Sequence, residues 1–201
     1  MKTNISIKQL KKSKLYSEEL GINLKSRSDR EIFKWFLVSI LFGARISETN
    51  AKNTYKAFER YNLLEPEKIL NAGWDFLVNP VMREGGYVRY DFKTSTKILQ
   101  ICEKLVKEYQ SSLNKLHEEA KNSKDLEKRL SEFYGIGPTT LNIFLREMRP
   151  YWQKADPATL AIVKAFAEEK INLDLKKYNR KSLTFIRIES GLIRLRRAFK
   201  E

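Results

Sequence analysis

The sequence predicts an all-α fold, and three observations support this prediction. Only eight glycines and five prolines interrupt the 201 residues, which leaves long stretches for helices. Apolar residues recur in these stretches at spacings of three and four, and the alternation typical of β-strands is missing. No internal repeat or low-complexity tract breaks the pattern. A chain of this length is expected to form one unit of two small lobes that share a cleft.

The first strongly apolar segment runs from Phe33 to Phe42. It is apolar on nearly all sides, which predicts a helix through the centre of a domain. The segment after it, residues 43–47, breaks the pattern, so Ser47 or Thr49 is expected to cap the next helix. The inward stripe of that helix consists of Ala51, Tyr55 and Phe58.

Pro66 is expected to be the first residue of a short helix that ends near Gly73. Asn79-Pro80 and Gly85-Gly86 are expected to bound an irregular connection. A longer helix follows from about Lys93 to Tyr109. Its apolar stripe consists of Ile98, Ile101, Cys102, Leu105, Val106 and Tyr109.

Two further segments complete the predicted helices. Leu113 to Leu130 is highly charged and predicts a mostly solvated helix pair. Ser182 to Phe199 predicts a final amphipathic helix with Phe185, Ile188, Leu192 and Leu195 inward. We therefore expect residues 1–201 to form one unit. Within it we expect a six-helix lobe over about residues 30–120 and a hairpin lobe over about 121–170, with the N-terminus and residues 171–201 completing the second lobe.

The chain carries 39 Lys+Arg against 25 Asp+Glu, a formal net charge of +14. A surplus of this size favours a polyanionic partner, because each neutralised phosphate releases counterions. The alternative is a basic surface that serves only solubility. One cysteine, Cys102, cannot form an internal disulfide or an iron–sulfur site, and one histidine, His117, cannot form a multi-histidine metal centre. His117 lies in a polar stretch and is expected to be solvated.

The longest apolar run, Trp35 to Phe42, is far shorter than the roughly 20 residues that span a bilayer. The Lys-rich N-terminus has no apolar signal region. We therefore expect an intracellular protein of the cytoplasm or nucleoid, with no membrane partner, that acts as a monomer.

The most distinctive motif is the hairpin Gly135-Ile136-Gly137, which separates a helix expected to end at Tyr134 from one expected to begin at Pro138. Gly135 can take the positive φ that ends a helix, and Gly137 allows the backbone to approach another surface closely. Ile136 would fill the junction between the two helices. The alternative is a helix–turn–helix joint used only for packing.

The start of the second helix predicts an anion site, because the first amides of a helix have no intrahelical partner. Two threonine hydroxyls beside these amides would add phosphate donors. The predicted phosphate-binding residues are Gly135, Gly137, Thr139 and Thr140.

This hairpin and two other segments resemble the helix-hairpin-helix DNA glycosylases of the endonuclease III superfamily. Phe36 to Arg45 is similar to the family's buried helix that ends at a DNA-facing loop, and Ala155 to Thr159 looks like its aspartate at a helix start. The resemblance covers about residues 30–170. It implies two helical lobes with a DNA-binding cleft, and double-stranded DNA with a lesion or mismatch as the partner.

Asp156 precedes Pro157, a pair that on its own predicts a helix N-cap followed by the first helical residue. The resemblance implies that this carboxylate stabilises positive charge on the sugar as the base departs, or orients the attacking water. Members that also cut the strand carry a lysine where this chain has Thr139, and a hydroxyl cannot form a Schiff base. Lys154 could be a displaced amine, but a solvated loop lysine is the simpler interpretation. A monofunctional enzyme is therefore predicted.

The resemblance implies further roles. Arg45 would fill the gap left by a flipped nucleotide and pair with the orphan base. Tyr151 and Trp152 are candidates for the base pocket, since stacking contributes ~1–3 kcal/mol per base. No cofactor is expected beyond a structural monovalent cation, which the resemblance assigns to the backbone carbonyls of Ser131, Phe133 and Gly135.

Three functions remain open from the sequence. The first is hydrolysis of the N-glycosidic bond of a damaged or mismatched base. The second is DNA binding through the same hairpin without catalysis. The third is an all-α adaptor for another protein, in which the charge surplus is incidental.

Overall fold

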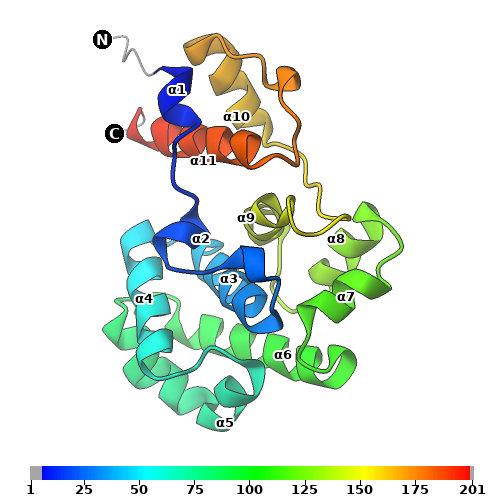
Figure 1. Cartoon of the computed structure of the whole chain (residues 1–201). Coiled ribbons are helices and arrows are strands. Elements are labelled where there is room, and N and C mark those ends of the chain that lie inside the picture. Colours follow the sequence, from blue (N-terminus) through cyan, green and yellow to red (C-terminus); the bar gives the residue numbers. More distant parts are fainter. Residues whose placement is uncertain (1–5, 200–201) are drawn as a thin grey trace.

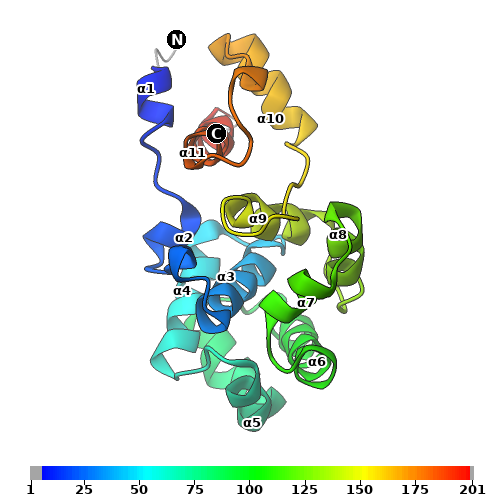
Figure 2. The same ribbon diagram turned by 45° about the vertical axis from the view of Figure 1, so that its right-hand side comes forward.

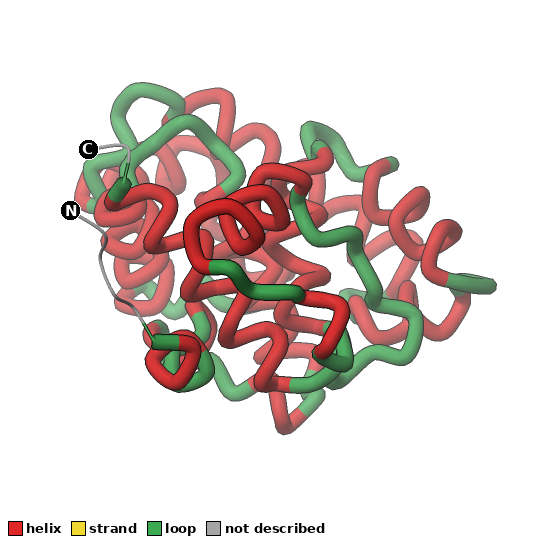
Figure 3. Tube along the Cα trace, turned by 90° about the horizontal axis from the view of Figure 1, so that it is seen from above, coloured by secondary structure: helices red, strands yellow, loops and turns green. Residues whose placement is uncertain are grey.

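The computed structural model of the protein describes residues 6–199. Within this range the chain is helical and contains no strand (Figure 3), which confirms the predicted all-α class. The helices are α1 (Ile7–Leu10), α2 (Tyr16–Glu19), α3 (Asp29–Phe42), α4 (Glu48–Arg60), α5 (Pro66–Phe76), α6 (Asp91–Tyr109), α7 (Leu113–Glu119), α8 (Ser123–Ser131), α9 (Pro138–Met148), α10 (Ala161–Phe166) and α11 (Leu183–Ala198). Shorter helical turns are η1 (Leu24–Ser26), η2 (Leu77–Met82), η3 (Ala167–Ile171) and η4 (Leu175–Lys177).

The predicted central helix corresponds to α3, which contacts α4, α6, α7 and α9 and is buried along most of its length. The Ser28 side chain caps it by accepting a hydrogen bond from the Glu31 amide. Ser47 caps α4 in the same way, through the Asn50 amide at 3.1 Å. Both starts therefore follow local N-cap chemistry.

α5 begins at Pro66 as predicted, and the chain leaves helical geometry at Gly73, where φ is 77°. Helical structure then resumes and continues through η2, apart from an extended Asn79 that precedes a cis peptide bond to Pro80. The connection before α6 is therefore more helical than the sequence predicted, and a turn at Gly85-Gly86 ends it.

The charged segment forms the predicted helix pair, α7 and α8, but the pair is not mostly solvated. Each helix presents a stripe of fully buried leucines to the core because of its spacing of three or four residues. These leucines are Leu113, Leu116, Leu126 and Leu130. The charged side chains occupy the opposite faces.

Two larger hydrophobic cores and a small third cluster of Leu15, Phe185 and Ile186 divide the described chain. The larger of the two cores is enclosed by α3 to α9, and the smaller by α1, α10 and α11, which lie together in Figure 1. The expected division assigned residues 121–170 to a second lobe, whereas α8 and α9 contribute to the larger core. In α11, the predicted inward residues Phe185, Ile188 and Leu192 are buried, and Leu195 is half-buried.

α9 lies at the joint between these two groups of helices (Figures 1 and 2). Its Glu147 is fully buried, and the carboxylate accepts hydrogen bonds from the backbone amides of Tyr16 (3.0 Å) and Ser17 (3.1 Å) at the start of α2. Burial raises the pKa of this carboxyl. In residues 6–199 no helix is both long enough and apolar enough to cross a membrane.

Candidate functional site

The hairpin between α8 and α9 has much of the predicted geometry. Gly135 has a φ of 70°, Ile136 is buried at the junction, and Pro138 occupies the first turn of α9. α8 ends at Ser131 and not at Tyr134, so the turn is longer than predicted. No side chain caps α9, whose N-cap residue is Gly137. The first turn therefore presents backbone amides of the kind that bind anions.

The two hairpin glycines differ in what the fold requires of them. Gly135 has left-handed backbone geometry and packs against the Lys97 side chain of α6. Gly137 has a φ of −103°, and a Cβ added there would meet no atom within 4 Å. No steric reason within the described chain requires glycine at position 137. An external surface that approaches the backbone would supply one.

We expect Gly135→Ala to lower the free energy of unfolding by about 1–2 kcal/mol, because alanine is strained at positive φ. Gly137→Ala is the matched control and should change stability by less than about 0.5 kcal/mol. Urea unfolding of both variants measures the difference. Equal losses would contradict the distinction between the two positions.

The two threonines of the first turn lie in different environments. Thr139 is exposed. Thr140 is 3% exposed, and its hydroxyl packs so closely on Gly43 that a Cβ there would collide with it. The predicted phosphate contact by the Thr140 hydroxyl is therefore corrected to a packing role. The same contact places the loop of residues 43–47, which carries the exposed Arg45, beside the start of α9.

The predicted cation site lies beside a lysine that sequence reasoning missed. The Phe133 carbonyl accepts the Ile136 amide hydrogen bond at 3.1 Å, which leaves one lone pair for a metal ion. Lys97 packs on Gly135, and burial together with the charge of Lys93 lowers the pKa of its ammonium group. A positive group beside the turn opposes binding of a second cation. The assignment of a cation to this turn stays a prediction.

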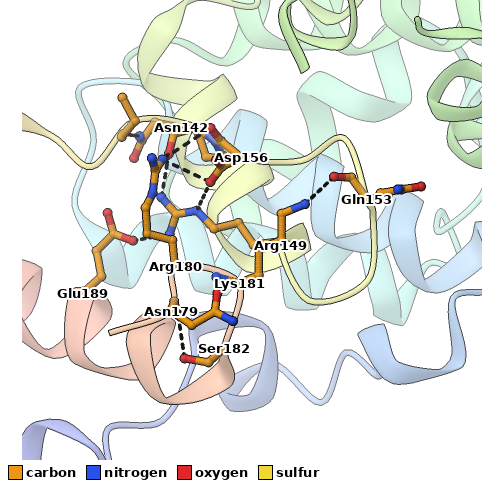
Figure 4. Close-up of polar contacts among 11 residues, drawn as sticks. Asn142, Arg149, Gln153, Asp156, Asn179, Arg180, Lys181, Ser182 and Glu189 are labelled. Atoms are coloured by element: carbon orange, nitrogen blue, oxygen red, sulfur yellow. Dashed lines mark hydrogen bonds and ion pairs between the residues drawn. The ribbon is translucent and has the colours of Figure 1, made fainter. Parts of the chain in front are cut away.

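Asp156 does not cap a helix, because α10 begins only at Ala161, with Leu160 as its N-cap residue. The Asp156 carboxylate instead lies 3.1 Å from the Arg180 guanidinium and 3.7 Å from that of Arg149 (Figure 4). The predicted N-cap is therefore wrong. The side chain is 33% exposed, so it is accessible but its charge is compensated by two arginines.

The two arginines also hold the backbone beside Asp156. Arg149 and Arg180 each donate a hydrogen bond of 2.7 Å to the Pro157 carbonyl. Arg149 is itself fully buried and paired with the buried Glu189 of α11. These contacts, drawn in Figure 4, join α9 to α11 across residues 156–157. They hold residues 156–157 in an irregular segment where the local pattern predicts a helix start.

The aromatic residues predicted for the base pocket have other roles. Trp152 is 2% exposed, donates to the Asn114 side chain at 2.9 Å, and stacks on the His117 ring with centroids 4.7 Å apart. It is a core residue and cannot stack on a base in this structure. Tyr151 is half-buried and lines a separate cavity beside residues 15–25.

His117 is not solvated as predicted, because Trp152 covers one face of its ring. Burial and the nearby charge of Lys154 lower its pKa to about 4. The Lys154 ammonium donates to the carbonyls of His117 (2.7 Å) and Glu118 (3.0 Å), in the last turn of α7. Lys154 is therefore a helix C-terminal cap and not a solvated loop lysine.

A cavity of about 190 Å³ lies where α2, α3, the start of α4, α9 and α11 meet. It begins at Pro138 and Thr139 of the hairpin helix, and Phe42 and Glu48 on its wall flank the loop that carries Arg45. Its apolar walls come from Tyr16, Phe42, Ile143, Leu160 and Ile193. Neither Asp156 nor the predicted pocket aromatics line it. Sequence reasoning missed this cavity because its walls come from five helices, several of them far apart in the chain.

The fold and the site together define an all-α protein in which a glycine hairpin, an exposed basic loop and a cavity meet at one joint. Comparisons with protein-family models, with curated proteins and with solved structures found no match. The functional conclusion therefore rests on the site itself.

Proposed function

We propose that the protein is a DNA repair glycosylase that hydrolyses the N-glycosidic bond of a damaged or mismatched base. The observation that carries this proposal is the cavity that begins at the first turn of the hairpin helix. A nucleotide whose phosphate meets the amides of Gly137 and Thr139 would have its base close to the cavity. Enzymes that act on a base must take it out of the stack and into such a pocket.

Binding to the duplex would come from the uncapped start of α9 and from the net charge of +14. Arg45 is exposed in the loop beside this helix start. It would enter the gap left by the flipped nucleotide and pair with the orphan base. Glycine at position 137 would allow the DNA backbone to approach.

The chemistry would rest on Asp156. Residues 156–160 form a segment without regular secondary structure that leads from the arginine pair to Leu160 on the cavity wall. Arg180 is the exposed partner of Asp156, with 44% of its side chain accessible, so a DNA phosphate would compete for it. The released carboxylate would then orient water or stabilise charge on the sugar. Thr139 cannot act as an amine nucleophile, so the product is an intact strand with an abasic site.

We expect Asp156→Asn to reduce base excision by at least about 100-fold, the scale of losing a general base. Binding of the same duplex should change little, because Asp156 contributes no positive charge. Single-turnover excision on duplexes with one lesion each, followed by alkali, measures the first effect, and fluorescence anisotropy measures the second. Asp75→Asn removes an equal charge from the exposed surface of α5 and should have no effect. Undiminished excision by Asp156→Asn would refute the mechanism.

A binding protein without catalysis is the second candidate. It is favoured by the pairing of Asp156 with two arginines and by its position outside the cavity lining. For such a protein we expect DNA binding that depends steeply on salt, shows no preference for a lesion and releases no base. The panel of single-lesion duplexes separates the two functions. Strand cleavage without alkali would contradict the monofunctional assignment.

A further inference from the structure

Three residues that line the cavity each carry a buried polar atom that the protein leaves unsatisfied. The Tyr16 hydroxyl, Asn142 Oδ1 and Arg146 Nε are buried and have no hydrogen-bond partner within residues 6–199. All three residues line the cavity, and their exposed fractions are 4%, 8% and 3%. Buried polar atoms are normally paired, since leaving one unpaired costs about 1–3 kcal/mol. Three such atoms around one cavity indicate a polar ligand.

Asn142 contributes a hydrogen-bond acceptor. Its Nδ2 donates to the Ala158 carbonyl at 2.9 Å. This bond identifies the nitrogen of the side-chain amide and leaves Oδ1 as the free end. A ligand next to Oδ1 must therefore donate an N–H or O–H.

Arg146 contributes a donor and a positive charge. Its guanidinium carries a permanent charge, yet no carboxylate of the described chain lies within ion-pair distance. The carboxylate of the neighbouring Glu147 is engaged by the amides at the start of α2. Burying a charge without a partner costs free energy. A ligand that offers a hydrogen-bond acceptor, such as a carbonyl oxygen, would therefore be favoured there.

Two arginines lie near the Tyr16 ring. The guanidinium of Arg194 lies 4.2 Å from the ring centre and is paired with Glu19 at 2.9 Å, whereas that of Arg146 lies 5.9 Å from the ring centre and has no carboxylate partner in the described chain. The one carboxylate on the cavity wall, Glu48, is already paired with Lys52 at 2.6 Å and Arg197 at 2.8 Å. The cavity therefore disfavours a cationic ligand.

We propose that this cavity selects a neutral nucleobase with a carbonyl oxygen beside a ring N–H, and rejects bases made cationic by alkylation. The proposal rests on the proposed glycosylase function and names its substrate class. The carbonyl accepts from Arg146 Nε–H, and the ring N–H donates to Asn142 Oδ1. The deaminated bases uracil and hypoxanthine carry this pair of groups. A cavity of roughly 150 Å³ holds a benzene ring, so about 190 Å³ suits a small heterocycle.

The decisive experiment compares bases of similar size in otherwise identical duplexes. Wild-type protein should excise hypoxanthine at least about 10-fold faster than 7-methylguanine, because 7-methylguanine brings a positive charge next to Arg146. It should excise uracil at least about 10-fold faster than cytosine, because cytosine lacks the hydrogen bonds that uracil makes. Preference for 7-methylguanine, or equal rates within both pairs, would overturn the proposal.

A second measurement does not depend on catalysis. Free hypoxanthine and uracil at millimolar concentration should raise the melting temperature of the wild-type protein, whereas adenine, cytosine and inorganic phosphate should not. If no duplex releases a base but this discrimination holds, the glycosylase function fails while the cavity assignment stands. Equal shifts for all five probes, no shift, or a shift with phosphate alone would overturn the cavity assignment.

Arg146→Gln tests the named residue. We expect hypoxanthine excision to fall about 10- to 100-fold, with no comparable loss on 7-methylguanine. Arg60→Gln is the matched control, since Arg60 lies on α4 outside the cavity and its side chain is 65% exposed. An unchanged ratio between the two substrates would contradict the role of Arg146. Should Arg146→Gln fail to fold, the two wild-type measurements decide the proposal.

Discussion

Replacing Arg149 by methionine is expected to lower the free energy of unfolding by about 3–5 kcal/mol. Arg149 and Glu189 are both fully buried; Glu189 accepts from Arg149 through Oε2, and its Oε1 has no hydrogen-bond partner in the described chain. The variant would leave the Glu189 carboxylate as an uncompensated charge in the interior. It would also remove one of the two hydrogen bonds that hold the Pro157 carbonyl. Urea unfolding with linear extrapolation measures the loss.

Two control variants separate the buried charge from the loss of packing. Arg149→Met combined with Glu189→Leu should recover much of the lost stability, because an apolar pair can replace a buried ion pair. Arg187→Met breaks a more accessible pair with Glu18 and should cost less than about 1 kcal/mol. A double variant as unstable as Arg149→Met alone would show that the unpaired charge is not the cause.

Lowering the pH from 7 to 4 is expected to destabilise the fold by about 1–2 kcal/mol through His117 alone, since solvent around the half-buried ring screens part of the effect. The pKa of His117 is about 4 in the folded protein, against a usual value of 6.5. Between pH 6.5 and 4, His117 is therefore protonated in the unfolded chain and mostly neutral in the folded protein. The stability from this group is complete above pH 6.5 and is lost as the pH falls towards 4. Thermal unfolding across this range measures the trend.

His117→Asn isolates this contribution, since the variant keeps a polar side chain that does not titrate. The wild-type stability should fall more steeply than that of the variant between pH 6.5 and 4.5. Burial raises the pKa of Glu147, so that group contributes in the opposite sense and is present in both proteins. Parallel pH profiles would rule out His117 as the source.

The parts of the fold set by local chemistry were predictable from the sequence. Ser47, Pro66 and Ser182 each begin a helix as their residue types indicate. Gly135 has the positive φ that its place between two helices required. In each case the deciding partner lies within a few residues along the chain.

The sequence-based predictions fail where contacts with residues far along the chain determine the local structure. Asp156-Pro157 has the local pattern of a helix start, but Arg149 and Arg180 hold it in an irregular segment. Trp152 follows a proline in an apparent loop, yet its partner Asn114 is 38 residues away. The cavity is another example, because Tyr16 and Arg146 are far apart in the sequence and meet only in the folded chain. Periodicity and spacing carry no information about such pairs.

The hydrogen bonds from α2 to Glu147 have a consequence for the order of folding. α2 has four residues, too few to persist as an isolated helix in water, and its first amides find their acceptor 131 and 130 residues further along the chain. Closing so long a loop is slow compared with forming a helix. We therefore expect the start of α2 to become ordered only after α9 has docked, and hydrogen exchange at the amides of Tyr16 and Ser17 to report when the joint between the two groups of helices closes.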